Sequence, residues 1–136
     1  MWRAFLRGLA VELDAQAGRD LSVSILRSVG HRMAAMLALV AVDSLEALEL
    51  EMNTVLAEIG WGNVGLTLRE GERCVVLSHS DLPCIGSAGE PPGAWLGPVL
   101  EGLYEGWLGQ QAGADRSFTA RVKGFENGSL VIRYGR

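Results

Sequence analysis

The first 60 residues carry apolar positions at the spacing of amphipathic helices. One stripe runs from Phe5 to Leu13 and ends before Gly18, and a second runs from Leu21 to Leu37. Both repeat every three or four positions between polar residues, which predicts two helices with one apolar side each. The members of the two stripes are Phe5, Leu6, Leu9 and Leu13, and then Leu21, Ile25, Val29, Met33, Met36 and Leu37.

A third helix has both of its ends marked in the sequence. Asp43 and Glu46 form a D-x-x-E pair, in which each side chain can accept a hydrogen bond from a free backbone N–H of the first turn. Gly60 provides the stop, because glycine readily adopts the left-handed conformation that ends many helices. The apolar positions between these ends are Leu45, Leu48, Met52, Val55 and Ile59.

The period changes from helical to alternating after Gly62. Residues 64–69 alternate with Val64, Leu66 and Leu68 on one side, and residues 73–78 return as a mostly apolar strand after a turn at 70–72. We expect a loop over 79–93, which is rich in Gly, Ser and Pro.

A fourth helix and a second hairpin complete the predicted order. The helix runs to about residue 111 with Pro98 in its first turn, and Phe118–Phe125 then pairs with Leu130–Tyr134 around Asn127-Gly128. The apolar side of this helix is Leu96, Val99, Leu100, Leu103, Tyr104 and Trp107. The order predicts one α+β domain over residues 1–136, in which two antiparallel hairpins form one sheet and the helices pack on it.

Charge and composition exclude some partners. The net charge of −4 leaves no basic face for nucleic acid, and the longest later apolar run, Met33–Val42, is shorter than the roughly 20 residues that span a bilayer. Charged residues interrupt the apolar start of the chain, so we expect no export signal and a cytoplasmic protein. Cys74 and Cys84 fit free thiols, and we expect no metal or other cofactor.

Three motifs suggest chemistry but lack the context it needs. Residues 60–65 spell GxGxxG, yet a helix enters this segment and a strand leaves it, the reverse of a dinucleotide site. His79, Asp81 and Ser87 have the residue types of a hydrolase triad without its nucleophile elbow. Glu101 and Glu105 lie on one helical face and could form a glycosidase pair, although exposed glutamates at this spacing are ordinary.

Gly102 and Gly106 lie four positions apart on the fourth helix. Each costs about 1 kcal/mol of helix stability relative to alanine, so close approach of another backbone should offset the cost. That backbone belongs either to the same helix of a neighbouring subunit, which makes both glycines candidates for an oligomer interface, or to the same chain.

A long ordered series of residues resembles the cellulose synthase D-subunit family. The series comprises Ile59–Gly62, Leu82-Pro83, Gly86–Pro91, Trp95-Leu96, Pro98–Tyr104, Trp107 and Gln111–Ala114, with weaker matches at Phe5-Leu6, Gly18, Val29-Gly30 and Met33. The resemblance implies a non-catalytic accessory subunit that assembles from dimers into a ring-like homo-octamer. It also implies contact with other synthase subunits and with nascent β-1,4-glucan chains, whose export and crystallisation the ring organises.

The family resemblance places glucan contact at the N-terminus. This chain lacks most of the leading extension of the family, which leaves Met1, Trp2 and Arg3, with Arg7 one helical turn beyond Arg3. Trp2 offers an aromatic plane and the arginines offer donors, although Trp2 could instead dock on a neighbouring helix.

Two alternative functions stay open. One is a small-molecule sensor with a pocket between sheet and helices, and the other is a glucan hydrolase using the paired glutamates. A periplasmic location is the alternative to a cytoplasmic one, because the ring is associated with emerging chains.

Overall fold

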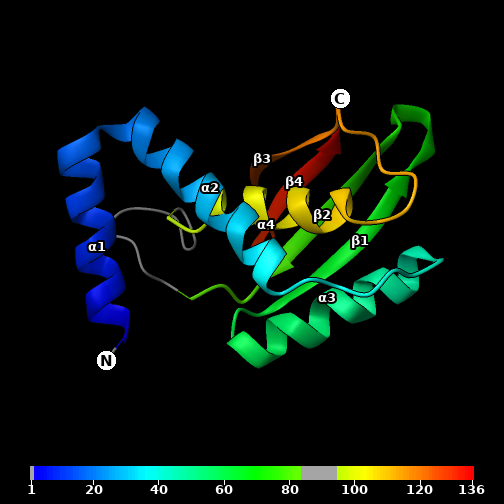
Figure 1. Cartoon of the computed structure of the whole chain (residues 1–136), viewed down its shortest axis with the longest axis horizontal. Coiled ribbons are helices and arrows are strands. Elements are labelled where there is room, and N and C mark those ends of the chain that lie inside the picture. Colours follow the sequence, from blue (N-terminus) through cyan, green and yellow to red (C-terminus); the bar gives the residue numbers. More distant parts are fainter. Residues whose placement is uncertain (1, 84–94) are drawn as a thin grey trace.

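The computed structural model describes residues 2–83 and 95–136, with the side chains of Trp2 and Arg3 outside the description. Four α-helices and four strands follow one another along these residues, with one short 3₁₀ turn (Figure 1). The helices are α1 (Trp2–Ala17), α2 (Arg19–Met36), α3 (Leu45–Ile59) and α4 (Gly97–Gly109). The strands are β1 (Asn63–Arg69), β2 (Cys74–Ser80), β3 (Thr119–Glu126) and β4 (Ser129–Gly135), and the turn η1 (Glu70–Glu72) joins β1 to β2.

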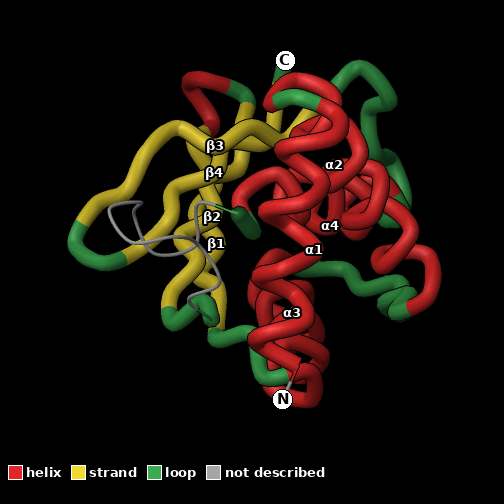
Figure 2. The backbone as a smooth tube through the Cα atoms, turned by 90° about the vertical axis from the view of Figure 1, so that its left-hand side faces the viewer, coloured by secondary structure: helices red, strands yellow, loops and turns green. Residues whose placement is uncertain are grey.

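The two hairpins join into a single antiparallel sheet with strand order β1-β2-β4-β3. Strands β2 and β4 pair at its centre, where Leu77 lies opposite Ile132. The helices lie on one side of the sheet (Figure 2). The α+β fold predicted from the sequence is therefore confirmed.

The second hairpin turns where the sequence predicts. Asn127 and Gly128 both have positive φ, 51° and 80°, which is the backbone of the two-residue turn that matches strand twist.

The first hairpin differs from expectation because β2 continues to Ser80. The sequence predicts a loop at His79, but His79 pairs with Val64 on one side and Leu130 on the other. Most of the predicted loop over 79–93 lies outside the described residues, as does Cys84. Cys74, the first residue of β2, is buried with a free thiol.

The start of α3 is shifted by one residue from the prediction. Ser44, not Asp43, is the N-cap: its backbone is extended, and its Oγ accepts a hydrogen bond from the Ala47 N–H at 3.1 Å. A serine hydroxyl at this position satisfies one of the N–H groups that the first turn leaves free. The predicted stop is confirmed, since Gly60 is left-handed with φ 74°.

The main core lies between the sheet and the two helices α3 and α4. All six residues of the apolar side predicted for the fourth helix are buried. They meet buried side chains from α3, such as Met52 and Leu56, and from the strands, such as Leu77 and Ile132. Helix α4 is thus the central element, with the sheet on one side and α2 on the other.

Helix α2 turns a different side inward from the one its apolar stripe predicts. Its buried residues are Ser22, Gly30 and Ala34, whereas Leu21, Ile25, Val29 and Met36 are exposed. The reason is the depth of contact with α4. A Cβ added to Gly30 would lie 2.7 Å from the Leu103 nitrogen.

The glycines of α4 complete this contact from the other side. A Cβ on Gly102 would overlap the Arg27 carbonyl oxygen and lie 2.9 Å from the His31 nitrogen, and one on Gly106 would press on the Ala34 side chain. The backbones of α2 and α4 therefore pack against each other at a separation that only small residues permit. Large side chains of α2 have no room on this side and lie on the opposite one.

Gly102→Ala should destabilise the fold, because the new methyl group overlaps backbone atoms that cannot move separately. We expect a loss of about 1–3 kcal/mol of unfolding free energy, which denaturant unfolding followed by circular dichroism would measure. Gly109→Ala is the matched control on the same helix, since nothing lies within 4 Å of its added Cβ. It should be neutral or stabilising by up to about 1 kcal/mol, and equal effects of the two changes would contradict the packing described.

Candidate functional site

Helices α1 and α2 expose an unusual number of large apolar side chains. Leu9 and Leu21 are 53% and 54% exposed, and Met36 reaches 76%. The full α1–α2 apolar set is Phe5, Leu6, Leu9, Val11, Leu21, Ile25, Val29 and Met36. Single exposed apolar residues are ordinary, but a concentration of them on two consecutive helices is typical of a surface that another molecule covers.

Helix α1 has little contact with the rest of the subunit. It packs chiefly on α2 and extends away from the sheet (Figure 1). Ala10 is the one buried residue among the α1 side chains that the structure describes. An amphipathic helix gains most of its stability by burying its apolar side, so α1 needs a further partner for that side.

The residues predicted to contact glucan belong to the first turns of α1. Trp2 is the first residue of the helix, Arg3 follows it, and the exposed Arg7 lies one turn further on. Met1 lies outside the described residues, as do the side chains of Trp2 and Arg3. Their contact with glucan stays a prediction.

Gly102 and Gly106 have a sufficient explanation within the subunit. Their Cβ positions point to Arg27, His31 and Ala34 of α2. Of the two alternatives from the sequence, packing within the chain accounts for both glycines. Their role in an oligomer interface stays a prediction without a contact that requires it.

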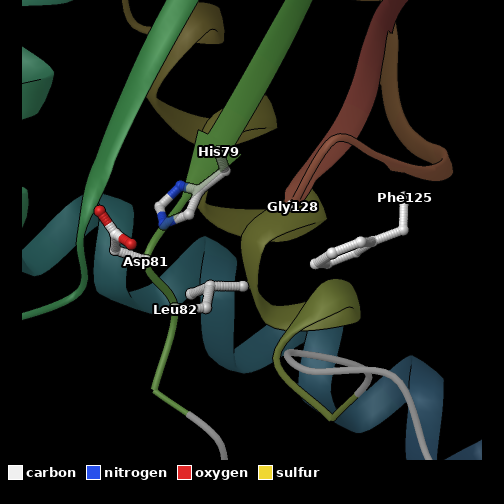
Figure 3. A pocket seen from close by; sticks show the side chains of 5 residues that line it. All are labelled: His79, Asp81, Leu82, Phe125 and Gly128. Carbon is white, nitrogen blue, oxygen red and sulfur yellow. The ribbon is translucent and has the colours of Figure 1, made fainter.

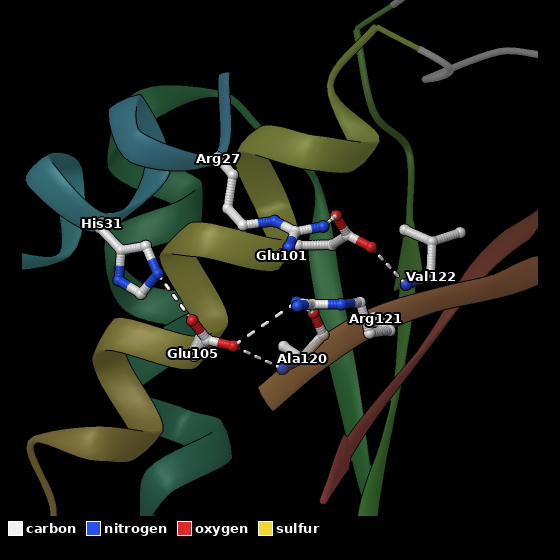
Figure 4. A network of polar contacts seen from close by, with 7 residues as sticks. All are labelled: Arg27, His31, Glu101, Glu105, Ala120, Arg121 and Val122. Carbon is white, nitrogen blue, oxygen red and sulfur yellow. Dashed lines mark hydrogen bonds and ion pairs between the residues drawn. The ribbon is translucent and has the colours of Figure 1, made fainter. Parts of the chain in front are cut away.

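The paired glutamates of α4 are held by a network of polar contacts (Figure 4). Glu101 accepts hydrogen bonds from Arg27 Nη2 at 2.5 Å and from the Val122 N–H at 2.7 Å. Glu105 accepts from the Ala120 N–H at 2.8 Å and pairs with His31 Nε2 at 2.7 Å. These contacts give both carboxylates a structural role between α2, α4 and β3, which the sequence spacing alone does not reveal.

His79 is fully buried beneath a pocket of about 240 Å³ that Leu82, Phe125 and Gly128 also line (Figure 3). Its Nε2 lies 2.6 Å from the Trp61 carbonyl oxygen, which can only accept, so Nε2 carries the proton. Nδ1 of the neutral ring then accepts from the Tyr104 hydroxyl. Both ring nitrogens are thereby used. Ser87, the third residue of the triad considered from the sequence, lies outside the described residues.

Burial sets the protonation of this pair. Desolvation lowers the pKa of His79 below its usual value, although the hydrogen bond to Trp61 and the charge of Asp81 act in the opposite direction. Burial also raises the pKa of Tyr104 well above its usual value. Both side chains are therefore neutral at pH 7 and bind each other as neutral groups.

No helix within residues 2–83 and 95–136 is both long enough and apolar enough to cross a lipid bilayer.

Comparison with known proteins identifies the family. A family model for the D-subunit of cellulose synthase matches residues 1–135. The chain belongs to the cellulose synthase D-subunit family. Curated relatives named cellulose synthase operon protein D, from Komagataeibacter xylinus and Komagataeibacter sucrofermentans, are 46% identical over 110 residues, which is 81% of this chain and 70% of each relative. Another such protein from Komagataeibacter xylinus is 44% identical over the same length.

Membership in the D-subunit family confirms the resemblance seen in the sequence. The match includes the N-terminal helices as well as the segment from Ile59 onward that carries the resemblance. The exposed side of α2 was the feature that sequence reasoning missed. The small residues Ser22, Gly30 and Ala34 recur at helical spacing, and this second stripe was the available signal.

Stability should fall as the pH drops below about 6.5, because the unfolded state then protonates His79 more readily than the folded state does. The loss per pH unit should approach but not exceed about 1.4 kcal/mol from this group. His79→Gln should flatten the pH dependence of unfolding in denaturant between pH 5 and 7. His31→Gln, at an exposed ring, is the control; an unchanged slope in His79→Gln would contradict the assignment.

Proposed function

We propose that this protein is a non-catalytic accessory subunit of a bacterial cellulose synthase complex. It organises the export and crystallisation of nascent β-1,4-glucan chains as an oligomeric scaffold. Membership in the D-subunit family supports the cellulose role. The observation that carries the scaffold role is the exposed α1–α2 apolar set.

The size of that exposed set favours self-assembly. Complete burial of one leucine side chain stabilises a complex by about 1.5–3 kcal/mol before the costs of association, and this surface offers eight large apolar residues. Two copies that meet through the same helices form a two-fold dimer, and further symmetric contacts between dimers close a ring. We propose a homo-octamer built from four such dimers.

The absence of catalysis is part of the same proposal. Glu101 and Glu105 have their oxygens engaged by backbone N–H groups of β3 and by side chains of α2. A glycosidase pair must instead present one protonated and one ionised carboxyl group to the sugar. The geometry thus supports a structural use of these residues.

We also propose a cytoplasmic location. Arg7, Glu12 and Asp14 interrupt the apolar positions of α1, which favours an amphipathic surface helix over the uninterrupted apolar run of an export signal.

Light scattering coupled to size exclusion tests the assembly. The wild-type protein should have eight times the mass of one 14.6 kDa chain. Leu9→Glu/Leu21→Glu should reduce the mass to that of smaller species, because buried carboxylates oppose an apolar interface. Leu50→Glu on α3 is the control, since Leu50 is also exposed but lies outside the α1–α2 apolar set. A monomeric wild-type protein at micromolar concentration would remove the ring proposal.

Glucan contact is proposed at the first turns of α1. A glucan chain is uncharged, with apolar ring faces and hydroxyl edges, so an aromatic plane beside hydrogen-bond donors suits it. Trp2 and Arg3 have these properties, and Arg7 can extend the polar row because it lies four residues beyond Arg3 on the helix.

Trp2→Ala/Arg3→Ala should assemble normally but fail to restore cellulose yield in a strain that lacks this protein. Arg116→Ala, at an exposed position far along the chain, should restore full yield. Normal yield from the double variant would rule out contact at the N-terminus. Loss of assembly would instead place Trp2 and Arg3 in the interface between subunits.

A further inference from the structure

The outer edge of β1 is bonded to side chains of α3 instead of another strand. Asn53 Oδ1 accepts a hydrogen bond from the Val64 N–H at 2.8 Å, and its Nδ2 donates to the Val64 carbonyl at 2.9 Å. Glu49 Oε1 accepts from the Leu66 N–H at 2.7 Å. Since β2 occupies the inner side of β1, these groups are the ones that a further strand would use.

The opposite edge of the sheet is closed in the same way. On β3, the Ala120 N–H donates to Glu105 and the Val122 N–H donates to Glu101, at 2.8 and 2.7 Å. Beyond Val122 the register shifts by an irregularity that includes the exposed Lys123. A bulge and a lysine at an edge are common obstacles to strand addition.

The two arrangements share one geometric rule. Each uses residues four apart on a helix to meet N–H groups two apart on a strand. Four residues rise about 6 Å along a helix, and two residues span about 6.6 Å along a strand, so the spacings match. A helix packed alongside an edge can therefore satisfy alternate outward N–H groups with side chains from successive turns.

We infer that the Glu49/Asn53 and Glu101/Glu105 pairs close the sheet against strand addition by a second copy of this chain. An open edge is a template for pairing, and growth by strand addition has no fixed end. A ring has a fixed number of members, so its subunits must meet elsewhere, on the helices. This inference rests on the proposed assembly, in which identical copies stay at high local concentration.

Opening the β1 edge tests the inference, because Glu49 and Asn53 are only partly buried and their removal leaves the core side chains of α3 in place. Glu49→Ala/Asn53→Ala should increase the rate at which thioflavin T fluorescence and scattered light rise at 37 °C by roughly tenfold or more. Glu58→Ala, an exposed carboxylate on the same helix, should leave the rate unchanged. Circular dichroism at the start of the reaction would check that the variant is folded.

A third change separates strand addition from simple loss of stability. Leu68 lies near the end of β1 and is half exposed, and lysine there hinders docking of a strand without replacing the lost hydrogen bonds. Adding Leu68→Lys to the double variant should return the rate to near that of the wild type. A double variant that behaves as the wild type would overturn the inference. Aggregation that Leu68→Lys does not reduce would also overturn it, because the pair would then only hold the fold. The mass of the wild-type oligomer, measured separately, decides the assembly proposal.

Discussion

The contact between the backbones of α2 and α4 is the constraint on which the rest of the molecule depends. Gly30 and Gly102 face the opposite helix with no side chain between, so α2 lies directly against α4 while α4 lies against the sheet. Because small residues occupy that contact, the bulky apolar residues of α2 must lie on its outer side. One packing decision thus fixes the three layers and also creates the surface that we propose for assembly.

The polar contacts follow from the same layering. With α4 held between α2 and the sheet, Glu101 reaches Arg27 on one side and the β3 backbone on the other. A carboxylate in this position needs several donors to offset its loss of water, and the two neighbouring elements provide them. Helix α3 is related to β1 in a simpler way, through Glu49 and Asn53.

The elements of the fold were predictable where local chemistry decides them. Asn127-Gly128 fixes a hairpin by backbone conformation alone, and α4 has a single apolar side that is fully buried. Helix α2 was misjudged because periodicity records hydrophobicity and not size, and its inward stripe is small instead of apolar. The cost of Gly102 in a helix was readable, but the identity of the backbone it meets depends on tertiary structure. The partners of Glu101 were hidden for the same reason.

Helices α4 and α1 differ greatly in how firmly they are held. Nine residues of α4 are buried, so its amide hydrogens should exchange with solvent only when the whole subunit opens. Helix α1 buries Ala10 alone among its described side chains, and it can unwind and re-form without disturbing the sheet. The element that carries much of the assembly surface is therefore also the one whose order a neighbouring subunit can change most, and its exchange rate reports on that neighbour.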